Sequence, residues 1–151
     1  MSLVRVLGRI HVRLYRLTGG RFVGRVGKAP ILLLTTTGRR SGEPRTAPLL
    51  YLRDGDQLAI VASFGGHPKH PVWYLNLSAN PEVQIQVGRE RFAATASTAN
   101  AEERKRLWPL FVEMYPGYAG YQRKTEREIP IVLLTRSSEL RSDLALQTGA
   151  G

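Results

Sequence analysis

Apolar residues in the central part of the chain recur in the pattern of β-strands, and turn-forming residues separate one group from the next. In the segment 82–87, for example, Val83, Ile85 and Val87 alternate with Gln84 and Gln86, which is typical of a strand with one buried face. The whole pattern predicts six strands, over 31–37, 45–53, 57–63, 82–87, 91–97 and 129–135. Because most connections are short, we expect a six-stranded antiparallel sheet curled into a small barrel, in a mainly β fold of the α+β class.

Helical patterns flank and interrupt these strands. Apolar residues from Leu3 to Leu17 recur at alternating steps of four and three, while arginines occupy most of the opposite side. The N-terminus is therefore predicted to form an amphipathic helix. A short helix is expected over 72–79, and a longer one after Asn100, where Glu103 completes the spacing of a capping box.

The chain has 151 residues, which is the size of one ordinary domain. We expect a basic N-terminal arm over 1–29, a cofactor-binding barrel domain over 30–136 and a flexible tail over 137–151. The absence of cysteine excludes disulfides and thiolate metal sites and favours a reducing, cytoplasmic compartment. Arginines interrupt the N-terminal helix too often for a signal sequence or a membrane span.

Positive charge is concentrated at the start of the chain. The formal net charge is +10, and nine basic residues precede the first acidic one, Glu43. A charge of this size predicts an acidic partner, which can be nucleic acid, an anionic membrane surface or a polyanionic small molecule. The basic helix can dock on the protein's own core, or it can lie at an anionic membrane with its apolar side inserted.

The turn between the first two predicted strands holds adjacent arginines. Gly38, Ser41 and Gly42 are turn formers, so Arg39 and Arg40 are expected at the tip of a hairpin-like loop, and a third arginine follows on the next strand. Backbone N–H groups of such a turn can form an anion-binding concavity, and guanidinium groups suit phosphate or carboxylate. The loop is therefore predicted to bind an anion, with a solvated turn as the alternative.

Three tyrosines and one serine are further candidates. Tyr115, Tyr118 and Tyr121 follow one another at steps of three around a Pro-Gly break, where they either fill the core or cover a flat ligand. Ser63 follows a strand without a GxSxG context or an evident His-carboxylate relay, so it is interpreted as a hydrogen-bond donor rather than a nucleophile. The two histidines that follow lack acidic or thiolate neighbours, and no metal site is predicted.

Three segments, taken together and in order, resemble the deazaflavin-dependent nitroreductase and quinone reductase family of actinobacteria. These are LLLTTTGRRSGEPRTAPLLYLRDGDQLAIVAS, HPVWYLNLSANPEVQIQV and WPLFVEMYPGYAGYQRKTEREIPIVLLT, and the resemblance covers residues 1 to 136. It implies the split β-barrel fold of FMN-binding proteins and the cofactor coenzyme F420, an 8-hydroxy-5-deazaflavin with a phosphate and an oligoglutamate tail. That tail is a polyanion, so it matches the charge of the arginine loop.

The resemblance also implies which residues form the site. The phosphate and tail would be bound by the loop residues Thr37, Gly38, Arg39, Arg40, Ser41, Gly42 and Arg45. The ring would be lined by the second strand, the strand end at residue 63 and the short helix, that is, by Pro48, Ala62, Ser63, Phe64, Val72, Trp73 and Asn76. Lys69 is expected to replace a lysine that some relatives carry at position 64. The acceptor would be oriented, and its developing oxyanion stabilised, by Ser63, Tyr115, Tyr118 and Tyr121.

On this resemblance the chain is an oxidoreductase that transfers hydride from reduced F420 to a quinone such as menaquinone, with nitroaromatic compounds as further acceptors. Three alternatives stay open: an F420-dependent reductase of another unsaturated acceptor, an FMN-dependent oxidoreductase and a non-catalytic F420 carrier. A basic nucleic-acid-binding module is a hypothesis from another class, although no nucleic acid is expected. Because menaquinone resides in the membrane, the resemblance favours a cytoplasmic protein held at the inner face of the cell membrane by its N-terminal helix. The oligomeric state is not predicted.

Overall fold

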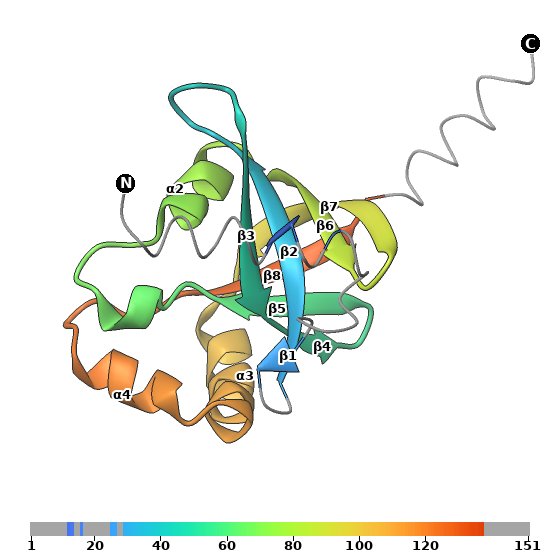
Figure 1. Ribbon diagram of the computed structural model, residues 1–151. Helices are drawn as coiled ribbons and strands as arrows, with labels where there is room; N and C mark the ends of the chain where they lie inside the picture. Colours follow the sequence, from blue (N-terminus) through green and yellow to red (C-terminus); the bar gives the residue numbers. More distant parts are fainter. Residues whose placement is uncertain (1–11, 14–15, 17–24, 27–28, 138–151) are drawn as a thin grey trace, which may run out of the picture.

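A strongly curled antiparallel sheet organises the molecule (Figure 1). The computed structural model describes residues 12–13, 16, 25–26 and 29–137. Within these residues the strands are β1 (Arg25–Val26), β2 (Ala29–Thr37), β3 (Pro44–Leu50), β4 (Leu52–Asp54), β5 (Gln57–Val61), β6 (Glu82–Val87), β7 (Glu90–Thr98) and β8 (Ile131–Arg136). Their order in the sheet is β1-β2-β6-β7-β8-β5-β4, and β3 pairs with the opposite edge of β2.

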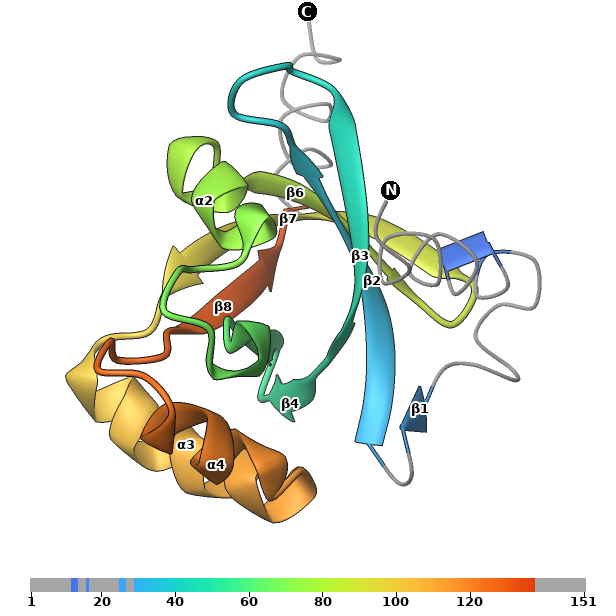
Figure 2. The same ribbon diagram turned by 60° about the vertical axis from the view of Figure 1, so that its left-hand side comes forward.

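The predicted mainly β, antiparallel architecture is confirmed, with one strand divided and a two-residue strand, β1, added. The predicted strand 45–53 is divided at Tyr51 into β3 and β4, and the N–H of Tyr51 still donates to the carbonyl of Pro30 in β2 at 3.1 Å. β3 then pairs with β2, whereas β4 pairs with β5. Because β3 pairs with β2 near one end of the sheet order and β4 lies at the other end, their junction at Tyr51 requires the sheet to curl into a half-barrel (Figure 2).

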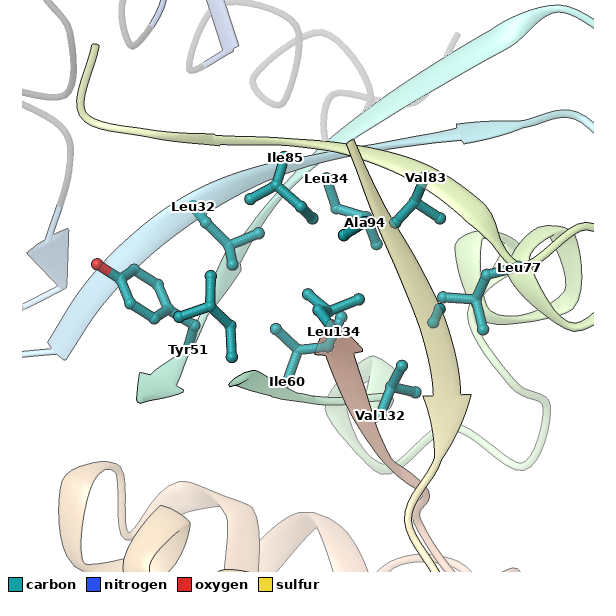
Figure 3. Packing of buried hydrophobic residues seen from close by; sticks show 12 residues of the cluster. Leu32, Leu34, Tyr51, Ile60, Leu77, Val83, Ile85, Ala94, Val132 and Leu134 are labelled. Carbon is teal, nitrogen blue, oxygen red and sulfur yellow. The ribbon is translucent and has the colours of Figure 1, made fainter. Parts of the chain in front are cut away.

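The unbroken apolar runs of β2, β5 and β8 reflect burial on both faces. In β8, Val132 and Leu134 belong to the cluster inside the curl, whereas Ile131 and Leu133 pack toward the helices. The interior of the curl (Figure 3) is filled by Leu32, Leu34, Tyr51, Leu58, Ile60, Leu77, Val83, Ile85, Ala94, Ala96, Val132 and Leu134. Because small barrels of this kind are packed with side chains, a bound ligand has to lie outside this interior.

Helices cover the remaining apolar face of the sheet. They are α2 (Val72–Ala79), α3 (Ala101–Met114) and α4 (Gly117–Arg123), and a 3-10 turn, η1 (Phe64–Gly66), precedes them in a segment predicted to be irregular. The predicted capping box is present at the start of α3: Asn100 Oδ1 accepts from the Glu103 N–H at 2.8 Å, and the Glu103 carboxylate accepts from the Asn100 N–H at 3.0 Å. α3 and α4 pack on the outer side of β5 and β8 through a second buried cluster.

The predicted N-terminal helix falls almost wholly outside the described residues. Of its positions only Val12, Arg13 and Arg16 are described, and they are helical. Val12 packs on Ile31 and Leu33, on the outer face of β2, and the Arg16 guanidinium donates to Thr46 Oγ1 at 3.1 Å. At these residues the arm is docked on the sheet. Across the described part of the chain, no helix is long and apolar enough to cross a membrane.

Only the first residue of the predicted tail, 137–151, lies within the described residues. Ser137, its first residue, donates its N–H to the carbonyl of Ala93 at 2.9 Å and so extends the pairing of β8 with β7. Residues 138–151 lie outside the described residues.

Candidate functional site

The loop between β2 and β3 is closed by its own hydrogen bonds. The Gly38 N–H donates to the Glu43 carbonyl, and the Gly42 N–H donates to the Gly38 carbonyl, both at 2.8 Å. Gly42 has a φ of +70°, and a Cβ added at Gly38 would lie 2.6 Å from Ser41 Oγ. Glycine is therefore required at both positions, and the loop has a defined shape that projects past the end of the sheet (Figure 2).

Hydrogen-bond donors gather at the tip of this loop. Arg39, Arg40 and Arg45 are exposed, as predicted for an anion site. Ser41 Oγ accepts from the Glu43 N–H at 3.1 Å, which leaves the hydroxyl proton of Ser41 to donate outward. The N–H groups of Arg40 and Ser41 make no hydrogen bond to any described residue. Two guanidinium groups, two N–H groups and a hydroxyl thus lie on one loop, with a third guanidinium, that of Arg45, at the start of β3; this is a donor set suited to phosphate and carboxylate oxygens.

Asn76 ties this loop to α2. Its side chain is only 1% exposed. The amide oxygen accepts from the N–H of Arg39 at 3.1 Å, and the amide nitrogen donates to Thr36 Oγ1 at 3.1 Å. Both ends of the side chain are therefore committed to the protein, and Asn76 acts as an anchor for the arginine loop.

The chain after β5 forms a strained corner. Phe64, Gly65 and Gly66 have φ values of +45°, +61° and +80°, and the Phe64 side chain is 54% exposed. A Cβ added at Gly66 would lie 2.6 Å from the carbonyl oxygen of Tyr121, so this glycine lets the corner pack directly on α4. A positive φ is unfavourable for phenylalanine and marks a candidate functional position.

Arg127 holds the corner and was not predicted from the sequence. Its guanidinium donates to the carbonyl oxygens of Ser63 at 2.8 Å, His67 at 2.9 Å and Ala62 at 3.2 Å. It also lies 3.2 Å from Nδ1 of His70, and burial followed by the charge of Arg127 lowers the pKa of His70 below its ordinary value. His70 is thus kept neutral and able to accept. Arg127 lies in a segment with several other charged residues, so no local sequence pattern distinguishes it from them.

The three predicted tyrosines come together, but in different environments. The hydroxyls of Tyr115 and Tyr121 are 3.2 Å apart, and this hydrogen bond raises the pKa of Tyr115. Tyr118 is 5% exposed and packs edge-on against Phe111 and Tyr115. Burial raises the pKa of Tyr118 far above its ordinary value, so its hydroxyl remains protonated. That hydroxyl makes no hydrogen bond to any described residue and can act as a donor.

The structure joins the predicted residues into two groups on the same side of the sheet, where α2, η1 and α4 follow one another (Figures 1 and 2). One group is the arginine loop with α2, joined by Asn76. The other is the corner at Ser63 with the tyrosines of α4, joined by Gly66 and Arg127.

The other predicted residues differ in how far a ligand can reach them. Val72 and Lys69 are exposed, whereas Trp73 and Pro48 are half-buried. Ala62 is 0% exposed and offers only backbone, which already bonds to Arg127.

Two hollows lie elsewhere on the surface. One, of about 330 Å³, touches the predicted site only at Thr37 and Gly42 and is otherwise lined by residues of β2, β3, β6 and β7 and by Asn80. The other, of about 260 Å³, lies between Arg16 and Arg91 on the outer face of β2 and β6. Neither is lined by the strand-end or tyrosine residues of the predicted site.

Comparison with known proteins gives a consistent match. The family model described as F420H(2)-dependent quinone reductase matches residues 7–136. A protein named F420H(2)-dependent quinone reductase from Mycobacterium tuberculosis is 48% identical over 132 residues, which are 85% of this chain and 89% of that protein.

Solved structures agree with this match. The structure of an F420-H2 dependent reductase, FDR-A, is 48% identical, with a TM-score of 0.64 over 70% of this chain and 93% of that chain. A domain-swapped dimer is 40% identical, with a TM-score of 0.67 over 88% and 99%. HutZ, a heme storage protein from Vibrio cholerae, is 15% identical with a TM-score of 0.57 over 85% and 89%, and shares the fold alone.

We expect Asn76→Leu to lower the free energy of unfolding by about 1–3 kcal/mol, because it leaves the Arg39 N–H and the Thr36 hydroxyl without their partner. Urea unfolding measures this change. Ser78→Ala is the matched control, since the exposed Ser78 hydroxyl bonds only to the Tyr74 carbonyl of its own helix. If both variants unfold like the unmodified protein, Asn76 is not an anchor.

Proposed function

The chain belongs to the F420H(2)-dependent quinone reductase family, and it is an oxidoreductase of that family; we propose that it binds reduced F420 along the face between the arginine loop and the corner at Ser63, and reduces a quinone there. The observation that carries the location is the set of donors on and beside the loop: the exposed guanidinium groups of Arg39, Arg40 and Arg45, and two N–H groups that make no hydrogen bond to any described residue. When bound, F420 supplies a hydride and little one-electron chemistry.

The loop fits the polyanionic part of this cofactor. A phosphate and an oligoglutamate tail present several anionic oxygens, and each guanidinium can donate to two of them at once. The defined backbone of the loop and its Asn76 anchor keep these donors in place before binding, which lowers the entropy lost when the ligand binds. We assign Thr37, Gly38, Ser41 and Gly42 to the shape of this cradle and the arginines to its charge.

The ring of the cofactor is assigned to the surface between β3, the corner and α2. Pro48, Phe64, Val72 and Trp73 offer apolar contacts there, and Lys69 is an exposed cation on the connecting segment. The protein's task at this surface is alignment, because hydride transfer needs donor and acceptor atoms held in contact.

The acceptor side is assigned to Ser63 and the tyrosines. Reduction of a quinone places negative charge on one oxygen, which a fixed hydrogen-bond donor stabilises. Tyr118 suits this role because its raised pKa keeps the hydroxyl protonated and no described residue occupies it. The hydrogen bond between the hydroxyls of Tyr115 and Tyr121 holds these two rings beside Tyr118. Solvent supplies the proton that completes the reduction.

Both the acceptor and the role of the deazaflavin have alternatives that experiments can separate. Menaquinone and nitroaromatic compounds are candidate acceptors, since cofactor loop and acceptor side can diverge independently. An FMN-dependent enzyme or a non-catalytic carrier is tested by fluorescence titration with F420 and FMN, followed by turnover with each acceptor. Tight FMN binding without F420 binding would favour the first, and F420 binding without any turnover would favour the second.

Arg39→Gln and Arg40→Gln are each expected to weaken F420 binding by about 1–2 kcal/mol, or about 5- to 30-fold, through loss of a charge-assisted contact. Fluorescence titration measures the dissociation constant, and added salt should reduce the difference. Arg89→Gln, an exposed arginine between β6 and β7, removes the same charge elsewhere and should leave binding unchanged. Equal affinity in all variants would contradict the placement of the tail.

Tyr118→Phe is expected to lower kcat for a soluble quinone by about 10- to 100-fold while leaving the F420 dissociation constant unchanged, since only the oxyanion donor is lost. Steady-state kinetics and fluorescence titration separate the two effects. Tyr51→Phe, in the filled interior of the sheet, is the matched control. Unchanged turnover in Tyr118→Phe would remove this residue from the acceptor side.

Peripheral contact with an anionic membrane is proposed for the basic N-terminal arm, on the basis of its amphipathic pattern and charge. Deletion of residues 1–20 is expected to reduce co-sedimentation with anionic vesicles and turnover of long-chain quinones, while sparing short soluble ones. A deletion that leaves vesicle binding intact would show that the arm has only the docked role seen at Val12 and Arg16.

A further inference from the structure

Arg127 makes an unusual set of contacts for an arginine. All three nitrogens of its guanidinium are used: Nε donates to His67, Nη2 to Ser63, and Nη1 to Ala62, in each case to the backbone carbonyl. Nη1 also faces Nδ1 of His70 at 3.2 Å. Within the described residues no carboxylate forms an ion pair with it. The cation is therefore balanced by carbonyl dipoles that belong to one short segment.

The segment that it binds does not hold its shape by local preference. Phe64, Gly65 and Gly66 all have positive φ values, which cost free energy at the phenylalanine and entropy at the glycines. The carbonyls before and after this turn, those of Ser63 and His67, converge on the guanidinium. Without the guanidinium the His67 carbonyl would lose its partner and the Ser63 carbonyl would keep only the N–H of Gly66, at 2.9 Å, so the strained turn would be held by its own backbone bonds alone.

Arg127 is itself fixed to the helix that bears the tyrosines. Its carbonyl accepts from Gln122 Nε2 at 2.8 Å, and Gln122 Oε1 accepts from the N–H of Ile129 at 2.9 Å and from Arg104 at 3.1 Å. Gln122 lies on α4, one residue after Tyr121. One hydrogen-bond chain therefore runs from α3 and α4 through Arg127 to the end of β5.

We propose that Arg127 is a positioning residue for the reaction: it fixes Ser63 and Phe64 at the distance from Tyr118 and Tyr121 that the acceptor requires. This inference rests on the proposed function, since it presupposes that the acceptor binds between these residues. Arg127 lies outside the arginine loop, so it governs turnover of the acceptor and not attachment of the cofactor tail.

The test compares Arg127→Ala, Arg127→Lys and Arg123→Ala, the last being an exposed arginine on α4. We expect Arg127→Ala to lower kcat for a soluble quinone by about 10- to 100-fold, because small displacements at a reacting centre have effects of this size. Its F420 dissociation constant should rise by a smaller factor than kcat falls, because the tail contacts on the arginine loop are untouched and only the ring contact at Phe64 depends on the turn. Arg127→Lys should recover part of the activity, and Arg123→Ala should behave like the unmodified protein.

Chemical rescue separates positioning from a general loss of structure. Methylguanidinium at millimolar concentration should restore turnover of Arg127→Ala, whereas sodium chloride of equal ionic strength should not. The amide NMR signals of residues 63–67 should shift in this variant and return on addition of methylguanidinium. If Arg127→Ala does not fold, Arg127→Lys is examined in the same way, with hydrogen exchange of residues 63–67 as the measure of the turn.

The proposal is overturned if folded Arg127→Ala turns over quinone normally, if it loses F420 binding in proportion to turnover, or if Arg127→Lys keeps both the turn and full activity unchanged. If the proposed function is wrong, the unmodified protein also shows no quinone reduction. This result distinguishes failure of the proposed function from failure of the Arg127 proposal. In that event a return of the 63–67 signals with methylguanidinium still identifies Arg127 as the residue that holds the turn, and confines its role to structure.

Discussion

Continuity of the chain at Tyr51 is the constraint on which the rest of the structure depends. β3 pairs with β2 near one end of the sheet order and β4 lies at the other end, yet a single residue joins them, so the sheet has to curl. The curl is small enough that twelve buried side chains fill it. A cofactor the size of a deazaflavin is therefore excluded from the interior, and binding is left to the loops at the rim.

Loops at a rim lack the ladder hydrogen bonds that keep strands in register, and here two side chains replace them. Asn76 fixes the arginine loop to α2, and Arg127 fixes the corner at Ser63 to α4. In both cases a polar side chain satisfies backbone groups of a segment far away in the sequence. The two residues have different roles. Asn76 holds the arginines that suit the cofactor tail, and Arg127 positions the donors that face the acceptor.

The sequence predicts most of the fold because two signals indicate each strand: its apolar residues, and the turn-forming residues that separate it from the next strand. Ile131 to Leu134, for instance, are buried on both faces and read as an unbroken apolar run. The break at Tyr51 was missed because nothing in its neighbourhood interrupts that pattern. The arginine loop could be predicted from its glycines, whereas Arg127 could not, since its partners lie 57 to 65 residues away. Asn76 was expected to line the cofactor ring, on resemblance alone; the structure shows that it also anchors the arginine loop, through contacts that the sequence does not indicate.

The central claim is that the cofactor lies on the face between the arginine loop and the corner, and not in either hollow. Amide NMR spectra recorded while F420 is added test this most directly. We expect shifts that concentrate at Arg39 to Gly42, at Ser63 to Gly65 and in α2, with none in the turn at Gly88 and Arg89. Shifts centred on Gln84 and Arg91, which line the hollow on the outer face of the sheet, would contradict it.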